Sequence, residues 1–368
     1  MHILHIVGAR PNFMKAAPVL RALGNWQGVR QTLIHTGQHY DANMSDVFFH
    51  DLEIPEPDVN LGVGAGSHAQ QTAQILSQLE PVVEEYHPDL VMVYGDVNST
   101  LAATLVCAKL LIPVGHVEAG LRSFDRTMPE EINRLVTDQL AQLLFTPSVD
   151  GDENLLREGV AADRIHFVGN VMIDSLVRLL VQAEESTLLA DLKLRPRSYA
   201  LVTLHRPSNV DDPETLAAIM AALGEISCQL PIIFPVHPRT RQRLNASNGH
   251  RGTRVHILEP LSYVDFLALQ RLAGMVITDS GGIQEETTYL GVPCLTMREN
   301  TERPVTVSLG TNSLIGQDFK RLQTEVASIL AGEQKRGRVP PFWDGHAAER
   351  IAEAVMAWKR SHRALVHL

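Results

Sequence analysis

Short apolar runs alternate with helical stretches along almost the whole chain, and this alternation limits the folds that are open to it. In the first half the apolar runs occupy residues 3–7, 31–36, 90–94, 114–117 and 143–145. Helical stretches such as 69–86 and 99–110 lie between several of them. Parallel strands need long crossovers, usually helices, so this order predicts a parallel sheet with helices on both faces.

The same pattern begins again in the second half of the chain. Apolar runs recur at residues 199–203, 232–236, 255–258, 275–278 and 294–297. A chain of 368 residues also exceeds one typical hydrophobic core. We therefore predict an α/β protein with two doubly wound, Rossmann-like domains at residues 1–170 and 171–368. The last helix, about 345–361, can pack back on the N-terminal domain.

Composition narrows the class of partner. The formal net charge is −10 and no basic block occurs, which argues against nucleic acid or an anionic membrane. No apolar run reaches the ~18 residues of a membrane span, and residues 1–7 are typical of a first strand and not of a signal peptide. The three cysteines, Cys107, Cys228 and Cys294, are far apart, which predicts neither a disulfide framework nor a zinc site and favours a reducing cytoplasm.

Polar residues follow several of the predicted strands at the point where each strand ends. The first strand is followed by Arg10 and Lys15, and later strand ends carry Asp96, Glu118, His205 and His237. A single residue of this kind is more often a hydrogen-bonded strand end than a site. In doubly wound sheets, however, ligands bind outside the carboxyl ends of the strands. Polar residues at equivalent places in both halves therefore predict a ligand cleft between the domains.

The segment 279–286, Asp-Ser-Gly-Gly-Ile-Gln-Glu-Glu, indicates a nucleotide site. Its two glycines let the backbone approach a ligand closely, just before a helix that opens near Ile283. Free N–H groups at such a helix start form a seat for phosphate. A carboxylate about one turn into the helix, Glu285 or Glu286, can accept both hydroxyls of a ribose. The segment thus predicts a nucleoside diphosphate site, with a plain strand–turn–helix corner as the alternative.

Motifs for other nucleotide cofactors and for metals are missing. The first strand is followed by Gly-Ala-Arg-Pro and not by G-x-G-x-x-G, and no P-loop lysine motif occurs. Nicotinamide and ATP chemistry are therefore not supported. His35 and His39 are four residues apart, but Gly37 between them predicts a turn, so we expect no metal site there.

A set of short motifs in a fixed order between about residues 3 and 315 carries a specific resemblance. They are Gly-Ala-Arg-Pro at 8–11, Tyr-Gly-Asp at 94–96, His-Val-Glu-Ala-Gly-Leu-Arg at 116–122, Met-Pro-Glu-Glu-Ile-Asn-Arg at 128–134, Thr-Leu-His-Arg at 203–206, the segment 279–286, and Thr-Glu-Arg-Pro at 301–304. Together they resemble the non-hydrolysing UDP-N-acetylglucosamine 2-epimerases. The resemblance implies a glycosyltransferase-B type fold with the active site in the cleft between the domains. It also implies a homodimer that interconverts UDP-GlcNAc and UDP-ManNAc, usually for polysaccharide biosynthesis. We expect no cofactor and no metal.

The resemblance implies roles for individual residues as well. Acid–base work at C2 falls to Asp96, Glu118 and Glu130, and His205 stabilises or protonates the leaving phosphate oxygen. The expected contacts to the UDP-sugar come from Arg10, Lys15, His237, Phe266, Ser280, Gly281, Gly282, Glu286 and Arg303. From the residues alone, Glu130 also fits an ordinary helix start after proline, and Phe266 also fits core packing.

Some bacterial members of the family are activated by their own substrate, UDP-GlcNAc. This chain differs from them at positions that are expected to bind the activator. Where arginines are expected, this sequence has Tyr40 and Pro207. Tyrosine offers one neutral hydroxyl and proline offers no donor, so we expect no activation by UDP-GlcNAc. The segment 35–45 is similar to relatives that epimerise UDP-2,3-diacetamido-glucuronic acid, whereas residues 284–286 and 301–304 favour UDP-GlcNAc.

Two further alternatives stay open. One is a hydrolysing epimerase that releases ManNAc and UDP. The other is of a different class: a catalytically silent nucleotide-sugar binding protein, or a retaining glycosyltransferase on the same fold. The intact set of acids together with His205 argues against a silent protein.

Overall fold

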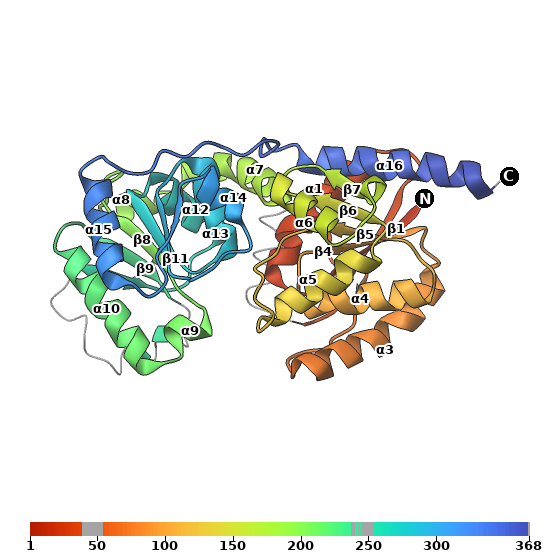
Figure 1. Ribbon diagram of the computed structural model, residues 1–368, viewed down its shortest axis with the longest axis horizontal. Helices are drawn as coiled ribbons and strands as arrows, with labels where there is room; N and C mark the ends of the chain where they lie inside the picture. Colours follow the sequence, from red (N-terminus) through yellow and green to blue (C-terminus); the bar gives the residue numbers. More distant parts are fainter. Residues whose placement is uncertain (39–53, 237–239, 242, 245–253, 367–368) are drawn as a thin grey trace. The chain divides into compact units, whose positions relative to one another are not determined.

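The computed structural model describes residues 1–38, 54–236, 240–241, 243–244 and 254–366 (Figure 1). The chain divides into two compact units: unit 1 is Met1–Val177 with Pro341–Leu368, and unit 2 is Arg178–Pro340. Each unit contains one parallel sheet with helices on both faces, so the predicted two-domain α/β fold is confirmed. The helix α7 (Val171–Glu185) is continuous across the division between the units.

Unit 1 is built on a seven-stranded parallel sheet with the order β3-β2-β1-β4-β5-β6-β7. Its strands are β1 (His2–Val7), β2 (Arg30–His35), β3 (Val59–Asn60), β4 (Leu90–Tyr94), β5 (Val114–Val117), β6 (Leu143–Thr146) and β7 (Ile165–Phe167). The winding direction reverses between β1 and β4, where Ile3 pairs with Leu90 in parallel register. Such a reversal opens a crevice at the carboxyl ends of the two strands, the usual ligand site of this architecture.

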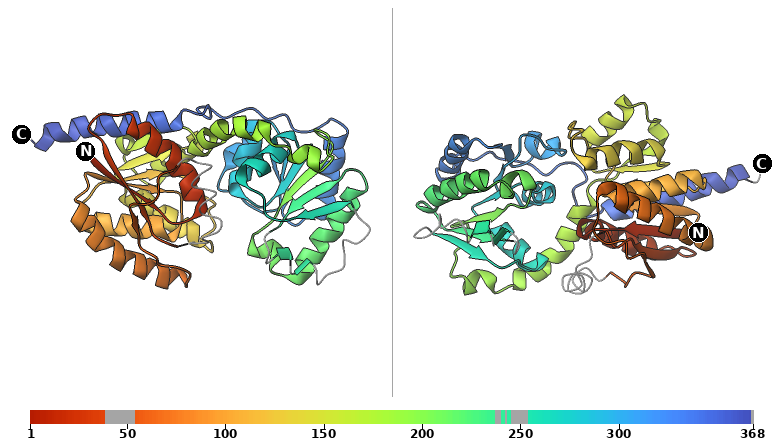
Figure 2. Two further views of the ribbon diagram at one scale, coloured as in Figure 1. Left: turned by 180° about the vertical axis from the view of Figure 1, so that it is seen from behind. Right: turned by 90° about the horizontal axis from the view of Figure 1, so that it is seen from below.

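Helices cover both faces of this sheet. They are α1 (Arg10–Gly24), α3 (His68–Tyr86), α4 (Asn98–Lys109), α5 (Pro129–Leu140), α6 (Val149–Arg157), the first part of α7, and α16 (Ala347–Val366). On one face α3 and α4 pack together, and on the other α16 runs beside α1 (Figures 1 and 2). All five residues of β4 are buried, as expected for a central parallel strand covered on both faces.

Unit 2 repeats the architecture with a six-stranded parallel sheet in the order β10-β9-β8-β11-β12-β13. Its strands are β8 (Ala200–Thr203), β9 (Ile232–Pro235), β10 (Val255–Leu258), β11 (Met275–Thr278), β12 (Cys294–Thr296) and β13 (Asn312–Leu314). Its helices are α8 (Leu188–Asp191), α9 (Pro207–Val210), α10 (Pro213–Ser227), α12 (Tyr263–Leu272), α13 (Gly281–Leu290), α14 (Pro304–Ser308) and α15 (Phe319–Leu330). One core cluster joins α10 and α15 to the sheet through Leu223, Phe234 and Val326. A second cluster, with Tyr199 and Leu269, joins α12 to the sheet.

The apolar runs predicted the long strands to within one or two residues. The predicted helices 69–86 and 99–110 correspond to α3 and α4. Three strands were missed, β3, β7 and β13, because each has only two or three residues at a sheet edge and so shows no period. Helix α13 begins at Gly281, two residues earlier than predicted. Among the described residues, no helix is both long and apolar enough to cross a membrane.

A buried carboxylate on α7 ties α16 to unit 1. Asp174 is 8% exposed, and its oxygens accept the backbone N–H groups of Ala347 at 3.1 Å and Ala348 at 2.7 Å, at the start of α16. These N–H groups have no partner inside the helix, and a negative charge there complements the helix dipole. Burial nevertheless outweighs the two N–H contacts and raises the pKa of Asp174 to about 6.

The raised pKa makes the stability contributed by Asp174 depend on pH. The folded-state pKa lies above the ordinary value of 3.8, so this contribution is fully present below about pH 4 and is lost as the pH rises through 6. Relative to the non-titrating Asp174→Asn variant, we expect the wild-type free energy of unfolding to fall by up to about 3 kcal/mol between pH 4 and pH 7, at ~1.4 kcal/mol per pKa unit. Urea unfolding of both proteins across this range measures the change. A difference that does not vary with pH contradicts the assignment.

Candidate active site

In unit 1, residues from the ends of β1, β4 and β5 meet at the carboxyl edge of the sheet. Lys15, in the second turn of α1, forms an ion pair with Glu118, which follows β5, and the two side chains are only 7% and 3% exposed. Gly95, which precedes Asp96, lies beneath this lysine. A Cβ at Gly95 would stand 2.6 Å from Lys15 Nζ, and its φ of +63° also favours glycine. The structure therefore brings Lys15 and Glu118 together beside the strand end that carries Asp96.

Glu118 belongs to a turn that a buried carboxylate holds in place. Its φ of +74° lies in the left-handed region, which is costly for a residue with a side chain. Asp138, on α5, accepts the N–H of Gly120 at 3.1 Å and pairs with Arg122 Nη1 at 2.7 Å. Burial alone would raise the pKa of Asp138, but His116 and Arg122 lower it below its usual range. An ionised acid therefore fixes the turn 116–122.

His116 connects this carboxylate to the neighbouring strand end. Its Nδ1 lies 2.7 Å from Asp138 Oδ1, and its Nε2 lies 2.8 Å from the carbonyl oxygen of Gly95. An ionised carboxylate and a carbonyl only accept hydrogen bonds, so a ring that satisfies both donates from both nitrogens. His116 thereby locks the end of β5, which carries Glu118, to the end of β4, which carries Asp96.

Asp96 is held by α5. Arg134 pairs with its carboxylate, and Asn133 Nδ2 donates to its carbonyl oxygen at 2.8 Å. The same Arg134 also pairs with Glu131. The side chains of Arg134 and Glu131 are 2% exposed, whereas that of Asp96 is 26% exposed. Asp96 is therefore the member of this group that a ligand can reach.

The adjacent acids Glu130 and Glu131 have different surroundings in the first turn of α5. Glu131 accepts the backbone N–H groups of Ser123 and Phe124, each at 3.0 Å. Burial works to raise the pKa of Glu131, but these N–H groups and Arg134 lower it overall. Glu130 is half-buried, and its side chain makes no hydrogen bond or ion pair within the part of the chain that the structure describes. Glu131 thus holds the loop that precedes α5, and Glu130 is available for chemistry.

In unit 2 the ends of β8 and β11 bring together His205 and Asp279. Asp279 is fully buried and accepts the backbone N–H groups of His205 at 3.1 Å and Arg206 at 2.9 Å. The ring Nδ1 of His205 lies 3.1 Å from Asp279 Oδ1, and the His205 side chain is 59% exposed. His205 therefore stands at the carboxyl edge of this sheet with one ring nitrogen engaged.

Helix α13 begins directly after Asp279 with Ser280 as its N-cap. The Ser280 side chain makes no capping hydrogen bond, so it leaves the first N–H groups of the helix, at Gly281 and Gly282, without a cap. The guanidinium of Arg303 lies over this helix start, because a Cβ at Gly281 would stand 2.5 Å from its Nη1. Glu302 Oε1 would lie 2.8 Å from the same Cβ, so the cation is already paired at this helix start, and the uncapped N–H groups are what favour an anion.

Arg303 is itself held by acids. Its Nε lies 2.8 Å from Glu285 Oε1, its Nη1 pairs with Glu302, and the side chain is 9% exposed. These contacts pair Glu285, one of the two acids of α13, with a cation. They also hold the guanidinium in a fixed position over the helix start.

The other acid of α13 lies against α12. Glu286 is buried, and its Oε1 accepts the hydroxyl of Tyr263 at 2.9 Å. Phe266, one turn further along α12, is half-buried and packs against the cluster that contains Leu269. The structure thus places Glu286 and Phe266 at the same pair of helices, and it gives Phe266 the partial core contact that its residue type suggested.

The structure does not describe how two of the predicted residues, Arg10 and His237, would contact a ligand. Arg10 is the first residue of α1, and the preceding N–H groups of Gly8 and Ala9 both donate to Asn12 Oδ1 at 3.0 Å, so this turn uses its own donors. His237 and Tyr40 lie outside the described residues. Within the described ranges, no group of three or more His, Cys, Asp or Glu side chains is arranged to hold a metal ion.

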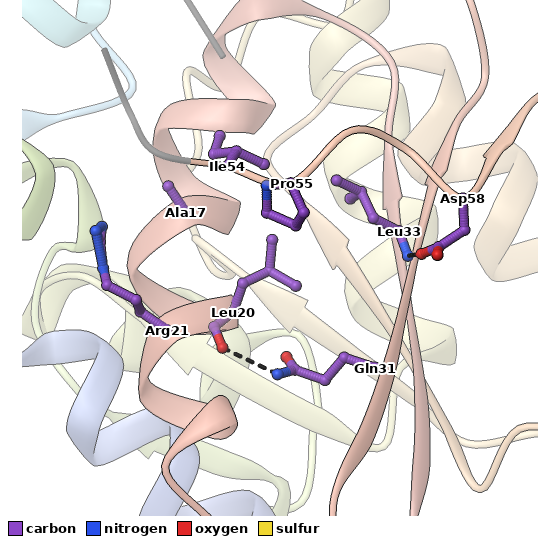
Figure 3. Close-up of a pocket in the computed structure, with 8 residues that line it drawn as sticks. All are labelled: Ala17, Leu20, Arg21, Gln31, Leu33, Ile54, Pro55 and Asp58. Carbon is purple, nitrogen blue, oxygen red and sulfur yellow. Dashed lines mark hydrogen bonds between the residues drawn. The ribbon is translucent and has the colours of Figure 1, made fainter. Parts of the chain in front are cut away.

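A separate pocket of about 200 Å³ in unit 1 contains none of these residues (Figure 3). It is lined by Ala17, Leu20, Arg21, Gln31, Leu33, Ile54, Pro55 and Asp58. Two of its polar side chains serve the fold: Gln31 Nε2 donates to the Leu20 carbonyl at 3.0 Å, and Asp58 accepts the Leu33 N–H at 2.7 Å. We assign no ligand to this pocket.

The residues that sequence analysis missed are the partners of the predicted acids. Asp138, Arg134 and Glu131 all lie on α5; Glu131 and Arg134 appear in the sequence analysis only within the motif 128–134, and Asp138 is not singled out there. Their spacing of three and four residues places them on one face, which is a usable signal. A charged helical face is usually solvated, however, so only their burial in the structure reveals their role.

The chain is similar to known proteins along most of its length. The model of the UDP-N-acetylglucosamine 2-epimerase family matches residues 21–356. A UDP-N-acetylglucosamine 2-epimerase from Methanocaldococcus jannaschii is 42% identical over 360 residues, which cover 95% of this chain and 98% of that protein. A UDP-2,3-diacetamido-2,3-dideoxy-D-glucuronate 2-epimerase from Pseudomonas aeruginosa is also 42% identical, with coverage of 96% and 99%. The crystal structure of M. jannaschii UDP-GlcNAc 2-epimerase in complex with UDP-GlcNAc and UDP matches with a TM-score of 0.88, 42% identity, and coverage of 97% and 100%.

The two doubly wound sheets, with acids at the strand ends of one and an uncapped helix start in the other, define a two-domain α/β protein of the glycosyltransferase-B type. Such a fold alone does not identify an activity. The family match and the similarity along the whole chain do identify the family: the chain belongs to the UDP-N-acetylglucosamine 2-epimerases. The family predicted from the motifs is therefore confirmed.

The contrast between Glu130 and Glu131 predicts effects of different size on the free energy of unfolding. Glu131→Gln breaks a buried ion pair with Arg134 and weakens two backbone contacts, so we expect a loss of about 3 kcal/mol in the free energy of unfolding. Glu130→Gln changes a half-buried side chain without such partners and should stay within about 0.5 kcal/mol of the wild type. Urea unfolding of the two variants tests this. Equal stabilities would contradict the assignment of Glu131 as the structural acid.

Proposed function

We propose that the protein catalyses the reversible epimerisation at C2 of UDP-GlcNAc to UDP-ManNAc. The observation that carries the proposal is the carboxyl edge of unit 1, where Glu118 and Asp96 follow neighbouring strands and each pairs with a buried cation. A family member of 42% identity has been crystallised with UDP-GlcNAc and UDP, which supports a UDP-sugar as the ligand here.

The chemistry explains why such a site needs several acids. The hydrogen at C2 of the sugar is not beside a carbonyl, so direct removal of the proton would leave an unstabilised carbanion. In the proposed route the C2–H and C1–O bonds break together: the C2 proton goes to a base, and the electron pair of the C1–O bond leaves with UDP. The product is 2-acetamidoglucal. UDP then adds back to C1 while an acid delivers a proton to the opposite face of C2. A base and an acid on the two faces of the ring are required.

We assign the acid–base work to Asp96, Glu118 and Glu130. Asp96 is the exposed member of its ion-pair group, and Glu130 has no partner among the described residues. Glu118 is paired with Lys15, so a proton transfer at this carboxylate is coupled to the position of the lysine charge. A diphosphate that attracts Lys15 would release Glu118 for its role as a base. Arg10 and His237 are further proposed contacts to the substrate.

We assign the grip on UDP to unit 2. The N–H groups of Gly281 and Gly282, together with Ser280 and Arg303, would hold the diphosphate at the start of α13. Glu286 would accept the ribose hydroxyls, and Phe266 would pack against the uracil. His205 would act on the phosphate oxygen that leaves C1. A tight grip also explains a non-hydrolysing outcome, because UDP that stays bound recaptures the intermediate before water does.

A second substrate has support of its own. The relative that acts on a UDP-diacetamido-glucuronate is as similar to this chain as the UDP-GlcNAc epimerase is, at 42% identity. Both sugars undergo the same change at C2, and they differ at C3 and C6. Parallel assays with the two UDP-sugars, compared by kcat/KM, decide between them.

One NMR experiment tests the proposed reaction. The protein is incubated with UDP-GlcNAc in deuterated water, and the sugar signals are followed. The proposal requires deuterium at C2 and a mixture of UDP-GlcNAc and UDP-ManNAc. Free ManNAc with UDP would instead identify a hydrolysing enzyme. No change would identify a binding protein, and product that forms only with an added acceptor would identify a glycosyltransferase.

We propose, on the resemblance to the family, that the enzyme is a cytoplasmic homodimer and that its product feeds polysaccharide biosynthesis. Sedimentation equilibrium of the purified chain tests the dimer, which would have about twice the 40.6 kDa of one chain.

The proposed acids should be required for turnover. Asp96→Asn, Glu118→Gln and Glu130→Gln keep the shape of each side chain and remove its capacity to accept a proton. General acid–base contributions are about 10²–10⁴-fold, so we expect kcat to fall by this order in each variant. Turnover of UDP-GlcNAc, with circular dichroism as the control for folding, measures the effect. A near wild-type kcat in Glu130→Gln would show that Glu130 is not a catalytic acid or base but only an acid at the start of α5.

The ribose contact should appear in the affinity for UDP. Glu286→Ala removes charged hydrogen bonds worth about 1.5–3 kcal/mol, so the Kd for UDP in calorimetry should rise by roughly ten- to a hundredfold. The matched control is Tyr263→Phe, which removes the hydroxyl that contacts Glu286 but keeps the carboxylate. Its Kd should change much less. An unchanged Kd in Glu286→Ala would exclude Glu286 from the UDP site.

The residues at the expected arginine positions predict simple kinetics. Pro207 begins α9 and offers no cation for the diphosphate of a second UDP-GlcNAc. We expect UDP-ManNAc alone to be converted without a lag, and initial rates to rise hyperbolically with UDP-GlcNAc. A sigmoidal rate curve, or strict dependence of the reverse reaction on added UDP-GlcNAc, would mean that an activator site exists in another form.

A further inference from the structure

The carboxylate of Asp279 accepts hydrogen bonds from several residues of the turn that follows β8. It is fully buried, and it accepts the backbone N–H groups of His205 at 3.1 Å and Arg206 at 2.9 Å. Asn209 Nδ2 donates to its Oδ2 at 3.0 Å. Burial would raise the pKa of Asp279, but the contacts with His205, Asn209 and Arg206 lower it overall, so the group stays ionised at neutral pH. Asp279 is therefore an acceptor at every one of these contacts.

Asp279 also contacts the side chain of His205. The ring Nδ1 of His205 lies 3.1 Å from Oδ1. The His205 side chain also helps, as a hydrogen-bond donor, to lower the pKa of Asp279, and a carboxylate can only accept, so we infer that Nδ1 carries the hydrogen. In a neutral ring this assigns the free electron pair to Nε2. The His205 side chain is 59% exposed, and Nε2 has no partner among the described residues. The ring is thus fixed at one nitrogen, and its other nitrogen remains for a ligand.

We propose that Asp279 is a positioning residue of the reaction: it holds His205 in the Nδ1–H form, so that Nε2 is the nitrogen that exchanges a proton with the departing diphosphate. The inference rests on the proposed epimerase function. As the C1–O bond breaks, the UDP oxygen takes a proton from Nε2 of the imidazolium. The ring becomes neutral and keeps its Nδ1–H on Asp279. When UDP adds back to C1, the proton returns to Nε2.

The arrangement has a physical advantage over a free histidine. The buried carboxylate compensates the positive ring while Nε2 carries its proton, and the fixed Nδ1–H bond prevents the ring from presenting the wrong nitrogen. Asp279 also directly precedes Ser280, the N-cap of α13. The same backbone segment therefore positions both the His205 ring and the proposed diphosphate site at the start of α13. This holds the proton donor, His205, close to the leaving group, UDP.

The turn offers a control that leaves the ring untouched. Asn209 Nδ2 bridges Asp279 Oδ2 and the carbonyl oxygen of Met297, the latter at 3.1 Å, and it has no contact with the His205 ring in the structure's described part. Asn209→Ala therefore weakens the turn through the same carboxylate but leaves the Nδ1 contact in place. Asp279→Asn, by contrast, replaces the acceptor next to Nδ1 with an amide that can donate to it.

The first test is the protonation pattern of His205 in the wild type. Nitrogen-15 NMR of histidine-labelled protein, with His205→Gln to assign the signal, distinguishes the two neutral forms. At a pH where the ring is neutral, the Nδ1–H form is expected; the imidazolium that donates from Nε2 is this form with one more proton. A predominant Nε2–H form in the wild type would overturn the proposal, whatever the variants do.

The second test measures both the protonated form of His205 and the kinetic constants in two variants. In Asp279→Asn we expect loss of the Nδ1–H form and a fall in kcat on the order of 10²-fold, as for the loss of a positioned acid, with KM changed by less than about threefold. In Asn209→Ala the Nδ1–H form should persist and kcat should fall much less. Affinity for UDP, measured by calorimetry, verifies that both variants are folded. Equal losses of kcat in the two variants, or an Asp279→Asn protein with wild-type kcat, would overturn the positioning role.

These measurements separate this inference from the proposed function. If the wild type shows no epimerisation in deuterated water, the proposed function fails, yet the NMR form of His205 still reports whether Asp279 sets the ring. If the wild type epimerises but His205 is not in the Nδ1–H form, only the present inference fails.

Discussion

Buried carboxylates that accept backbone N–H groups hold the turns on which the candidate site is built. Asp138 accepts the N–H of Gly120 in the turn of Glu118, and Asp279 accepts those of His205 and Arg206. Glu131 does the same for the loop that precedes α5. Moving a carboxylate out of water costs several kcal/mol, and this cost is offset only by good hydrogen bonds and cations. Each of the three has such hydrogen bonds, and Asp138 and Glu131 also pair with the cations Arg122 and Arg134, so the acid that holds each turn is itself held in place.

This arrangement explains how the chain tolerates local strain at Glu118. A left-handed backbone at a residue with a side chain costs about 1–3 kcal/mol and persists only where the surroundings impose it. Here Asp138, bound to both Gly120 and Arg122, imposes it from one side, and the Lys15 pair holds the side chain from the other. The protein itself therefore fixes the position of the Glu118 carboxylate, and a fixed position is what the proposed proton transfer at C2 requires.

The sequence predicted the elements well and the partners poorly, and the reason is physical. Apolar runs report which segments are buried strands, so β4 and β11 were predicted with their correct bounds. Edge strands such as β3 are too short to show a period. Residue types at strand ends predicted Asp96, Glu118 and His205 as candidates. That Arg134 joins Asp96 to Glu131, or that Glu285 pairs with Arg303 while Glu286 meets Tyr263, depends on tertiary packing. The spacing of three residues allows the Glu131–Arg134 pair, but no local pattern encodes the contacts between distant segments.

The same reasoning explains why family membership leaves the sugar open between two equally similar relatives. The proposed chemistry takes place at C1, C2 and the diphosphate, and the residues assigned to it would meet only the parts that the two UDP-sugars share. A glucuronate adds a carboxylate at C6, and burying that charge without a partner would cost more than the loss of any neutral contact. Selectivity must therefore come from side chains that meet C3 and C6. A cation positioned there would favour the uronic acid, and neutral donors would favour UDP-GlcNAc. Substrate choice in this fold can thus change at a few positions while Asp96, Glu118 and the carboxylates behind them stay the same.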